Sequence, residues 1–153
     1  MKIIAIDPGN INSAYVIMDC EYRIYDKGLL PNEELLKILK TEKYDELIIE
    51  MIASYGMAVG KTVFDTCVWI GRFIESCVCR KIPYYQIYRM EEKMCICHSQ
   101  KAKDCNIRQA LIDRFGEIGT KKNPGWFYGF KKDIWAAYAV GVTYIDTYFN
   151  IKK

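Results

Sequence analysis

Short aliphatic runs alternate with polar turns in the first part of the chain, a pattern that is typical of strands. The run from Ile3 to Ile6 ends at Asp7, and Pro8 and Gly9 then favour a tight turn in which Gly9 is free to adopt a positive φ. Residues 2–7, 13–19 and 22–27 are therefore predicted to form three strands of an antiparallel meander.

A second acid is predicted beside Asp7. Residues 33–40 have one apolar stripe and are predicted to form a helix that Asn32 caps. Residues 47–49 then form a short aliphatic run that ends at Glu50. A strand, helix, strand order implies a right-handed crossover, which makes the second strand parallel to the first and places Asp7 and Glu50 side by side.

The next segment combines a loop with a long apolar helix. Residues 54–60 form a Gly-bracketed loop directly after Glu50, where Tyr55 and Met57 are candidates for exposed contacts with a ligand. Residues 61–80 are predicted to be helical and are apolar on more than one face, which indicates burial on two sides. We expect the sheet on one side and a second copy of the chain on the other, so that the helix forms a homodimer interface through Phe64, Val68, Trp69 and Arg72.

Residues 84–88 are predicted to form a fifth strand, whereas residues 90–103 have no clear pattern. This unassigned region contains Cys95, Cys97 and His98, which are three potential zinc ligands. A structural zinc site needs four ligands, usually in two spaced pairs, and the second pair is missing. We therefore favour a strand with thiols on one face. The seven cysteines are an odd number, which argues for reduced thiols.

The C-terminal third is predicted to contain two helices. Asp104 is expected to cap a helix over residues 105–115, and Gly116 to end it. Residues 117–132 form a loop whose aromatic residues suit either base stacking or packing within the loop itself. The last helix is predicted over residues 132–149, with Asp133 in its first turn and small residues that let it lie close to the sheet.

Composition and charge limit the class of protein. The 153 residues predict a single domain over 1–153, and the chain has neither an apolar run long enough to cross a membrane nor a signal-peptide pattern, so we expect a cytoplasmic location. Residues 1–71 contain 7 Lys/Arg and 11 Asp/Glu, whereas residues 72–132 contain 13 and 6. This basic region suggests a polyanionic partner or, equally, a lysine-rich solvated surface. The lysines that we assign to phosphate contacts are Lys101, Lys103, Lys121, Lys122, Lys131 and Lys132. We assign Tyr55 and Met57 to nucleic-acid binding as well.

Three acids are thus expected at one edge of the sheet: Asp7, Glu50 and Asp133. Carboxylates that converge repel one another unless a cation lies among them. Oxygen ligands with room for water select Mg²⁺, with Mn²⁺ as an alternative. Two such ions can activate water and stabilise the leaving oxygen of a phosphodiester, which makes all three acids candidate metal-binding and catalytic residues.

The motifs IAIDPG, IIE and KKDIWAAYAVG, which contain these acids, resemble those of the RuvC family of Holliday-junction resolvases. The stretches EMIASYGMAVGKTVFDTCVWIGRF and KAKDCNIRQALIDRFG resemble most the small RuvC-like resolvases that bacteriophages encode. The resemblance covers nearly the whole chain. It implies an α/β, RNase H-like fold with a five-stranded mixed sheet, and a homodimer that binds branched DNA such as Holliday junctions and forks. It also implies hydrolytic nicking with Mg²⁺, held by Asp7, Glu50 and Asp133.

One position departs from the family pattern. The family has a second acid three residues after the first in its last motif, and this chain has Ala136 there. Either three acids suffice, or another acid or a water takes the place of the fourth. A further alternative is that the chain is an inactivated nuclease or a non-catalytic protein that binds branched DNA. A third interpretation, the phosphate loop of an actin-like ATPase, requires a second domain for which 153 residues leave no room.

Overall fold

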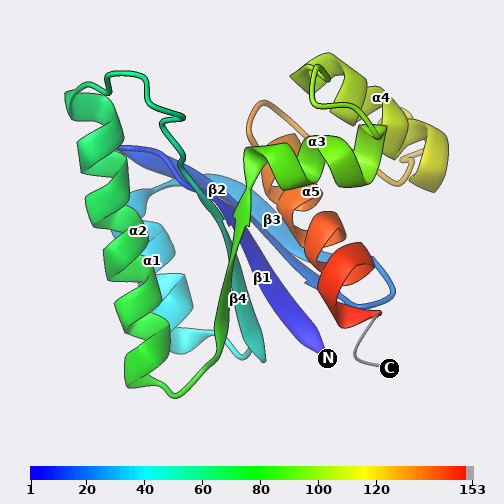
Figure 1. Cartoon of the computed structure of the whole chain (residues 1–153). Helices are drawn as coiled ribbons and strands as arrows, with labels where there is room; N and C mark the ends of the chain where they lie inside the picture. Colours follow the sequence, from blue (N-terminus) through cyan, green and yellow to red (C-terminus); the bar gives the residue numbers. More distant parts are fainter. Residues whose placement is uncertain (151–153) are drawn as a thin grey trace.

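The computed structural model describes residues 1–150, which form five strands and six helical segments. The sheet has the strand order β3-β2-β1-β4-β5, as predicted for a mixed five-stranded sheet (Figure 1). The strands are β1 (Lys2–Asp7), β2 (Asn12–Asp19), β3 (Ile24–Pro31), β4 (Glu46–Met51) and β5 (Tyr84–Tyr88). The helical segments are α1 (Asn32–Thr41), α2 (Lys61–Cys79), α3 (Arg89–Cys97), α4 (Asp104–Phe115), α5 (Ile134–Tyr144) and the π-helix η1 (Ile145–Phe149).

The strand directions bring three strand ends to one edge of the sheet. Strand β2 is antiparallel to both β1 and β3, whereas β4 is parallel to both β1 and β5. The predicted parallel pairing of the two acid-ending strands is therefore confirmed, with Ile6 opposite Ile49. The carboxyl ends of β1, β4 and β5 lie at the same edge, which we call the carboxyl edge of the sheet.

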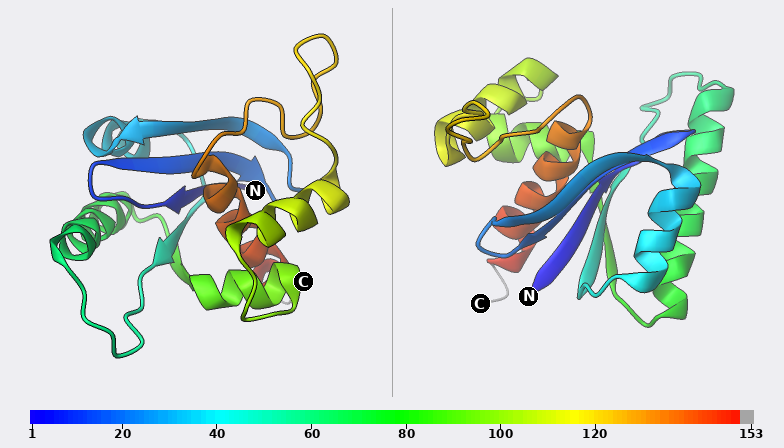
Figure 2. Two further views of the ribbon diagram at one scale, coloured as in Figure 1. Left: turned by 90° about the horizontal axis from the view of Figure 1, so that it is seen from above. Right: turned by 180° about the vertical axis from the view of Figure 1, so that it is seen from behind.

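Helices cover both faces of the sheet (Figure 2). Side chains alternate between faces along a strand, so Ile3 and Ala5 belong to one apolar cluster and Ile4 and Ile6 to another. Helices α1 and α2 contribute to the cluster with Ile4, whereas α4 and α5 contribute to the cluster with Ile3. The result is a three-layer α/β/α architecture with two cores.

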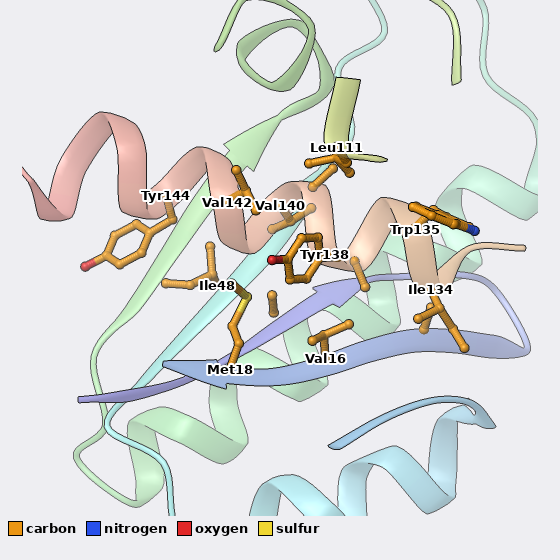
Figure 3. Packing of buried hydrophobic residues seen from close by; sticks show 14 of the residues in the cluster. Val16, Met18, Ile48, Leu111, Ile134, Trp135, Tyr138, Val140, Val142 and Tyr144 are labelled. Atoms are coloured by element: carbon orange, nitrogen blue, oxygen red, sulfur yellow. The ribbon is translucent and has the colours of Figure 1, made fainter. Parts of the chain in front are cut away.

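Helix α5 packs closely against the sheet, as its small residues predict (Figure 3). Ala137, Ala139 and Gly141 are buried, and a Cβ atom at Gly141 would lie 2.5 Å from Met18 Sδ. Real Cβ atoms essentially never make such a contact, so a larger residue at position 141 would require the Met18 side chain to move and would crowd the Ala5 Cβ, 3.2 Å away. The close approach packs the C-terminal half of α5 directly against β1 and β2.

The third strand begins later than the sequence predicts. It covers Ile24–Pro31 instead of residues 22–27. The Asp19 carboxylate accepts hydrogen bonds from the backbone N–H groups of Glu21 and Arg23, and Tyr22 has a φ of 66°. This side-chain-stabilised turn takes up the residues that the periodicity assigns to the strand.

Asn32 does not cap helix α1, contrary to the prediction. Its side chain is buried, accepts a hydrogen bond from Ser13 Oγ at 2.6 Å and donates one to the Gly9 carbonyl at 2.8 Å. Ser13 Oγ in turn accepts from the Gly9 N–H at 3.0 Å. Gly9 is needed because a Cβ would collide with the carbonyl oxygen of Asn12, and not because of a positive φ. These bonds hold the turn directly after Asp7.

We predict that Asn32→Ala lowers the free energy of unfolding by about 1–3 kcal/mol, because it leaves the Ser13 hydroxyl and the Gly9 carbonyl without this partner. Urea denaturation measures the change. Asn123→Ala is the control, because Asn123 is exposed and its bonds to Thr120 come from its backbone. Equal losses in the two variants would show that the Asn32 bonds do not stabilise the turn.

The region after β5 is a helix and not the strand that we favoured for the cysteines. Helix α3 covers Arg89–Cys97, and His98 ends it with a φ of 54°. Cys95 Sγ lies 3.7 Å from Thr147 Oγ1, in the interior between α3 and η1. Within residues 1–150, no helix is long and apolar enough to cross a membrane.

Candidate active site

Asp7 and Glu50 form a close carboxyl pair at the carboxyl edge. Each lies at the end of its strand, both are mostly buried, and their side chains are hydrogen-bonded to each other. Burial, together with the charges of Glu50 and Asp133, raises the pKa of Asp7 to about 8. Burial also raises the pKa of Glu50, which the nearby Arg89 guanidinium opposes. The two carboxyl groups therefore share a proton near neutral pH, because two adjacent, mostly buried carboxylates resist ionising together.

Asp133 lies next to this pair, at the start of α5. The helix begins at Ile134, so Asp133 is the N-cap residue and not part of the first turn as predicted. Its side chain makes no capping hydrogen bond, and its charge raises the pKa of both Asp7 and Glu50. The structure therefore places Asp133 within electrostatic reach of Asp7 and Glu50, the other two acids that the sequence singles out.

Three further charged residues surround the acids, and the sequence analysis did not assign them to the site. Arg89 follows β5, and its guanidinium donates to the Glu92 carboxylate at 2.7 Å and to Asp104. Glu92 is fully buried, which raises its pKa to about 9 even though Arg89 opposes the shift. Asp104 was expected to cap α4, but Lys103 is the N-cap residue there and Asp104 pairs with Arg89. The spacing of Arg89 and Glu92, three residues apart, is the signal in the sequence that indicates this pair once the region is recognised as helical.

Ala136, where the RuvC family has an acid, lines a small pocket beside Asp133. The pocket has a volume of about 60 Å³, and three basic side chains reach it, from Arg89, Arg108 and Lys132. Arg108 also lies over the Trp135 ring, with its guanidinium carbon 4.8 Å from the ring centroid. The place that a fourth carboxylate would occupy is thus a pocket in which three basic side chains outnumber two acids, Asp104 and Asp133.

The donor set of the site fits a hard divalent cation. Asp7, Glu50 and Asp133 supply carboxylate oxygens, which are the ligands that Mg²⁺ and Mn²⁺ prefer, and the mutual repulsion of these groups is the condition that a cation relieves. In residues 1–150, no three His, Cys, Asp or Glu side chains are already grouped closely enough to hold an ion. We infer that Arg89 compensates part of the charge in the metal-free protein.

The lysines assigned to DNA contact are all exposed and fall into three groups. Lys131 and Lys132 directly precede Asp133, and Lys132 lines the pocket of Ala136. Lys101 and Lys103 precede α4. Lys121 and Lys122 lie at the tip of a hairpin that a bridge between Gly119 and Pro124 closes, and this loop projects from the body of the molecule (Figure 2).

The aromatic residues of the loop over residues 117–132 mainly pack inside the protein. Phe127 and Phe130 are buried, and Trp126 stacks on Phe115 and donates to the Tyr138 hydroxyl at 3.2 Å. In the loop after β4, by contrast, Tyr55 and Met57 are 65% and 71% exposed. This loop lies at the carboxyl edge (Figure 1). These two side chains are therefore exposed on the loop that follows the strand of Glu50.

The outer face of α2 has an exposed apolar stripe. Phe64 and Val68 are 60% and 62% exposed, and they lie one turn apart. Trp69 packs against Phe73, and Arg72 lies over the Trp69 ring and pairs with Glu33 at 3.1 Å. Of the four predicted interface residues, Phe64 and Val68 are thus fully available to a partner, whereas Trp69 and Arg72 also have contacts within the chain.

No protein-family model matches the chain, and no curated protein sequence matches it. The fold, however, matches that of solved RuvC structures. Thermus thermophilus RuvC superposes with a TM-score of 0.75 at 13% identity, covering 99% of this chain and 97% of that one. A structure of Thermus thermophilus RuvC in complex with a Holliday junction substrate gives a TM-score of 0.76, also at 13% identity, with 99% and 96% covered. The chain therefore has the RuvC-like form of the RNase H-like fold.

Proposed function

We propose that this protein is a Mg²⁺-dependent endonuclease that binds branched DNA, such as Holliday junctions and forks, and nicks it by phosphodiester hydrolysis. The observation that carries the proposal is the convergence of Asp7, Glu50 and Asp133 at the carboxyl edge of a RuvC-like fold. A solved structure with this fold contains a Holliday junction substrate, which supports branched DNA as the ligand class.

Asp7, Glu50 and Asp133 would hold the metal. When bound, Mg²⁺, or Mn²⁺ in its place, supplies Lewis-acid activation of water and stabilises the leaving oxygen. The two buried acids are oriented by the strands that they end, and the turn after Asp7 is fixed by Asn32. A rigid support of this kind would keep the acids at a fixed position relative to the phosphate that is cleaved.

Nicking of a labelled four-way junction in Mg²⁺, compared with the same reaction in EDTA, tests the proposal. Mg²⁺-dependent nicks near the branch point, absent from linear duplex, are the expected result. The basic pocket at Ala136 favours one alternative, a non-catalytic protein that binds branched DNA. Tight junction binding without nicks in either Mg²⁺ or Mn²⁺ would establish this alternative.

The exposed lysines provide the path for the DNA backbone. We predict that the double variant Lys121→Gln/Lys122→Gln weakens junction binding and lowers the slope of log K against log salt by about two units, since each phosphate contact contributes roughly 0.9. Fluorescence anisotropy at several salt concentrations measures the slope. Lys40→Gln/Lys43→Gln is the control, because these residues flank the end of α1 at the opposite edge of the sheet. Equal slopes in both variants would place the DNA path elsewhere.

We also propose a homodimer through the outer face of α2, which would supply two sites for the two strands of a junction. Val68→Asp places a charge in the exposed stripe and is expected to give a monomer in sedimentation analysis, with little change in folding because Val68 is 62% exposed. Met94→Asp is the control, on an exposed residue of α3 across the sheet. A parent protein that is monomeric at micromolar concentration would contradict the dimer.

A further inference from the structure

Arg89 reaches the carboxyl edge from the strand next to Glu50. Strand β5 runs parallel to β4, with Tyr88 opposite Met51, so Arg89 leaves the sheet at the same edge as the acids. Its guanidinium Nη1 lies 2.7 Å from Glu92 Oε2, and Nη2 donates to Asp104. The side chain is 27% exposed and lines the pocket of Ala136. The Arg89 guanidinium is thus hydrogen-bonded to Glu92 and Asp104, and its side chain also lines the pocket of Ala136.

Glu92 has no exposed surface, and its oxygen Oε1 has no hydrogen-bond partner in the structure. A buried carboxyl group with an unpaired oxygen is costly, so a stabilising role alone does not account for it. Together with Asp104 from α4, it fixes the guanidinium from two helices. An arginine with two hydrogen bonds in place still has further N–H groups, which can form the planar fork that recognises phosphate oxygens.

The pocket in front of Arg89 is suited to an anion. Arg108 and Lys132 line it as well, so three basic side chains outnumber the two carboxylates there, Asp104 and Asp133. The side chain at position 136 is only a methyl group. A volume of about 60 Å³ exceeds the roughly 10–15 Å³ that a single water requires, so the pocket has room for phosphate oxygens. An acid at position 136 would place negative charge against these oxygens.

We propose that Arg89 binds a backbone phosphate of the DNA in this pocket, and that Glu92 and Asp104 position it for that contact. The inference rests on the proposed function and adds a phosphate-binding residue to it. The phosphate would lie next to Asp133, so its register relative to Asp7 and Glu50 would be set by a fixed arginine rather than by flexible surface lysines.

The test compares the double variant Arg89→Gln/Glu92→Gln with Glu92→Gln alone. Replacing both side chains avoids leaving the buried Glu92 carboxyl group without its Arg89 partner, and thermal unfolding confirms that both variants fold. In EDTA, the double variant is expected to lower the salt slope of four-way junction binding by about one unit relative to Glu92→Gln. In Mg²⁺, its nicking rate at saturating protein is expected to fall roughly a hundredfold, as for a misplaced substrate.

Two further variants distinguish a specific phosphate contact of Arg89 from a general effect of the protein's positive charge. Arg89→Lys/Glu92→Gln restores a point charge and is expected to recover the slope but only part of the nicking rate, because lysine lacks the planar fork. Arg23→Gln removes an exposed arginine at the turn after β2, at the opposite edge of the sheet, and is expected to leave the slope unchanged.

Equal slopes for Arg89→Gln/Glu92→Gln and Glu92→Gln would overturn the inference and leave Arg89 as a counter-ion of the acids. A parent that binds junctions but never nicks them would instead overturn the nuclease function, while the slopes still report on Arg89. A parent that binds no DNA overturns both.

Discussion

Asp7→Asn is expected to abolish Mg²⁺-dependent nicking while leaving junction binding in EDTA intact or slightly stronger. Asp7 is the acid on which burial, Glu50 and Asp133 all act, so its loss removes a central ligand of the proposed metal site. The nicking rate should fall by more than the roughly 10- to 100-fold typically lost when a group that only orients a metal ligand is removed. Phosphate binding should not weaken, because the variant carries one negative charge less.

The same variant is expected to stabilise the metal-free protein. The pKa of Asp7 is raised to about 8 in the folded state, against roughly 3.9 in an unfolded chain. The unfolded state therefore releases this proton first, and folding stability falls as the pH rises from about 4 to about 8. Asp7→Asn removes this loss and should raise the melting temperature in EDTA at pH 8 by about 2–8 °C, the equivalent of ~1–2 kcal/mol.

Asp113→Asn is the matched control, since Asp113 is exposed on α4 and accepts a hydrogen bond from Gln109. Melting curves in EDTA from pH 5 to pH 8.5, with and without added Mg²⁺, give the comparison. The parent should gain stability from Mg²⁺ at pH 8, whereas Asp7→Asn should gain little. If Asp7→Asn nicks junctions at the parent rate, Asp7 does not take part in the reaction.

The acids could be predicted because strand ends are simple to recognise. The aliphatic runs before Asp7 and Glu50 mark two buried strands, and the crossover rule makes these strands parallel. Asp133 precedes a helix whose small residues predict close contact with the sheet. In each case a local pattern and one topological rule determine where the side chain lies.

The supporting residues could not be predicted in the same way. Asn32 stabilises the turn after Asp7 through side-chain bonds that span 19 and 23 residues, and its sequence position indicates a helix cap equally well. Arg89 and Glu92 lie in a helix of only nine residues. Three of its charged residues, Arg89, Glu91 and Glu92, are buried or half-buried, so the helix has no clear apolar stripe that the sequence would reveal. Their role depends on the fold, since only the parallel pairing of β4 and β5 brings Arg89 to the acids.

Ala136→Asp is expected to increase Mg²⁺ affinity and, at the same time, to weaken junction binding in EDTA. Ala136 and Asp133 lie three residues apart and line the same pocket, so a carboxylate at position 136 would join the acids at the start of α5. It would also place a negative charge in front of Arg89, Arg108 and Lys132, where we propose that a phosphate binds. The two effects oppose each other and are measured separately.

The Mg²⁺ concentration at half of the maximal thermal stabilisation should fall about tenfold in Ala136→Asp, and the affinity for a four-way junction in EDTA should fall by a similar factor. Ala136→Asn is the control, because asparagine has nearly the same size as aspartate but carries no charge. If the parent nicks slowly, the added acid should raise the rate at low Mg²⁺, where metal binding is limiting. A parent that is fully active at low Mg²⁺ would show that three acids suffice. Unchanged Mg²⁺ titration and unchanged DNA binding would mean that position 136 faces neither the metal nor the phosphate.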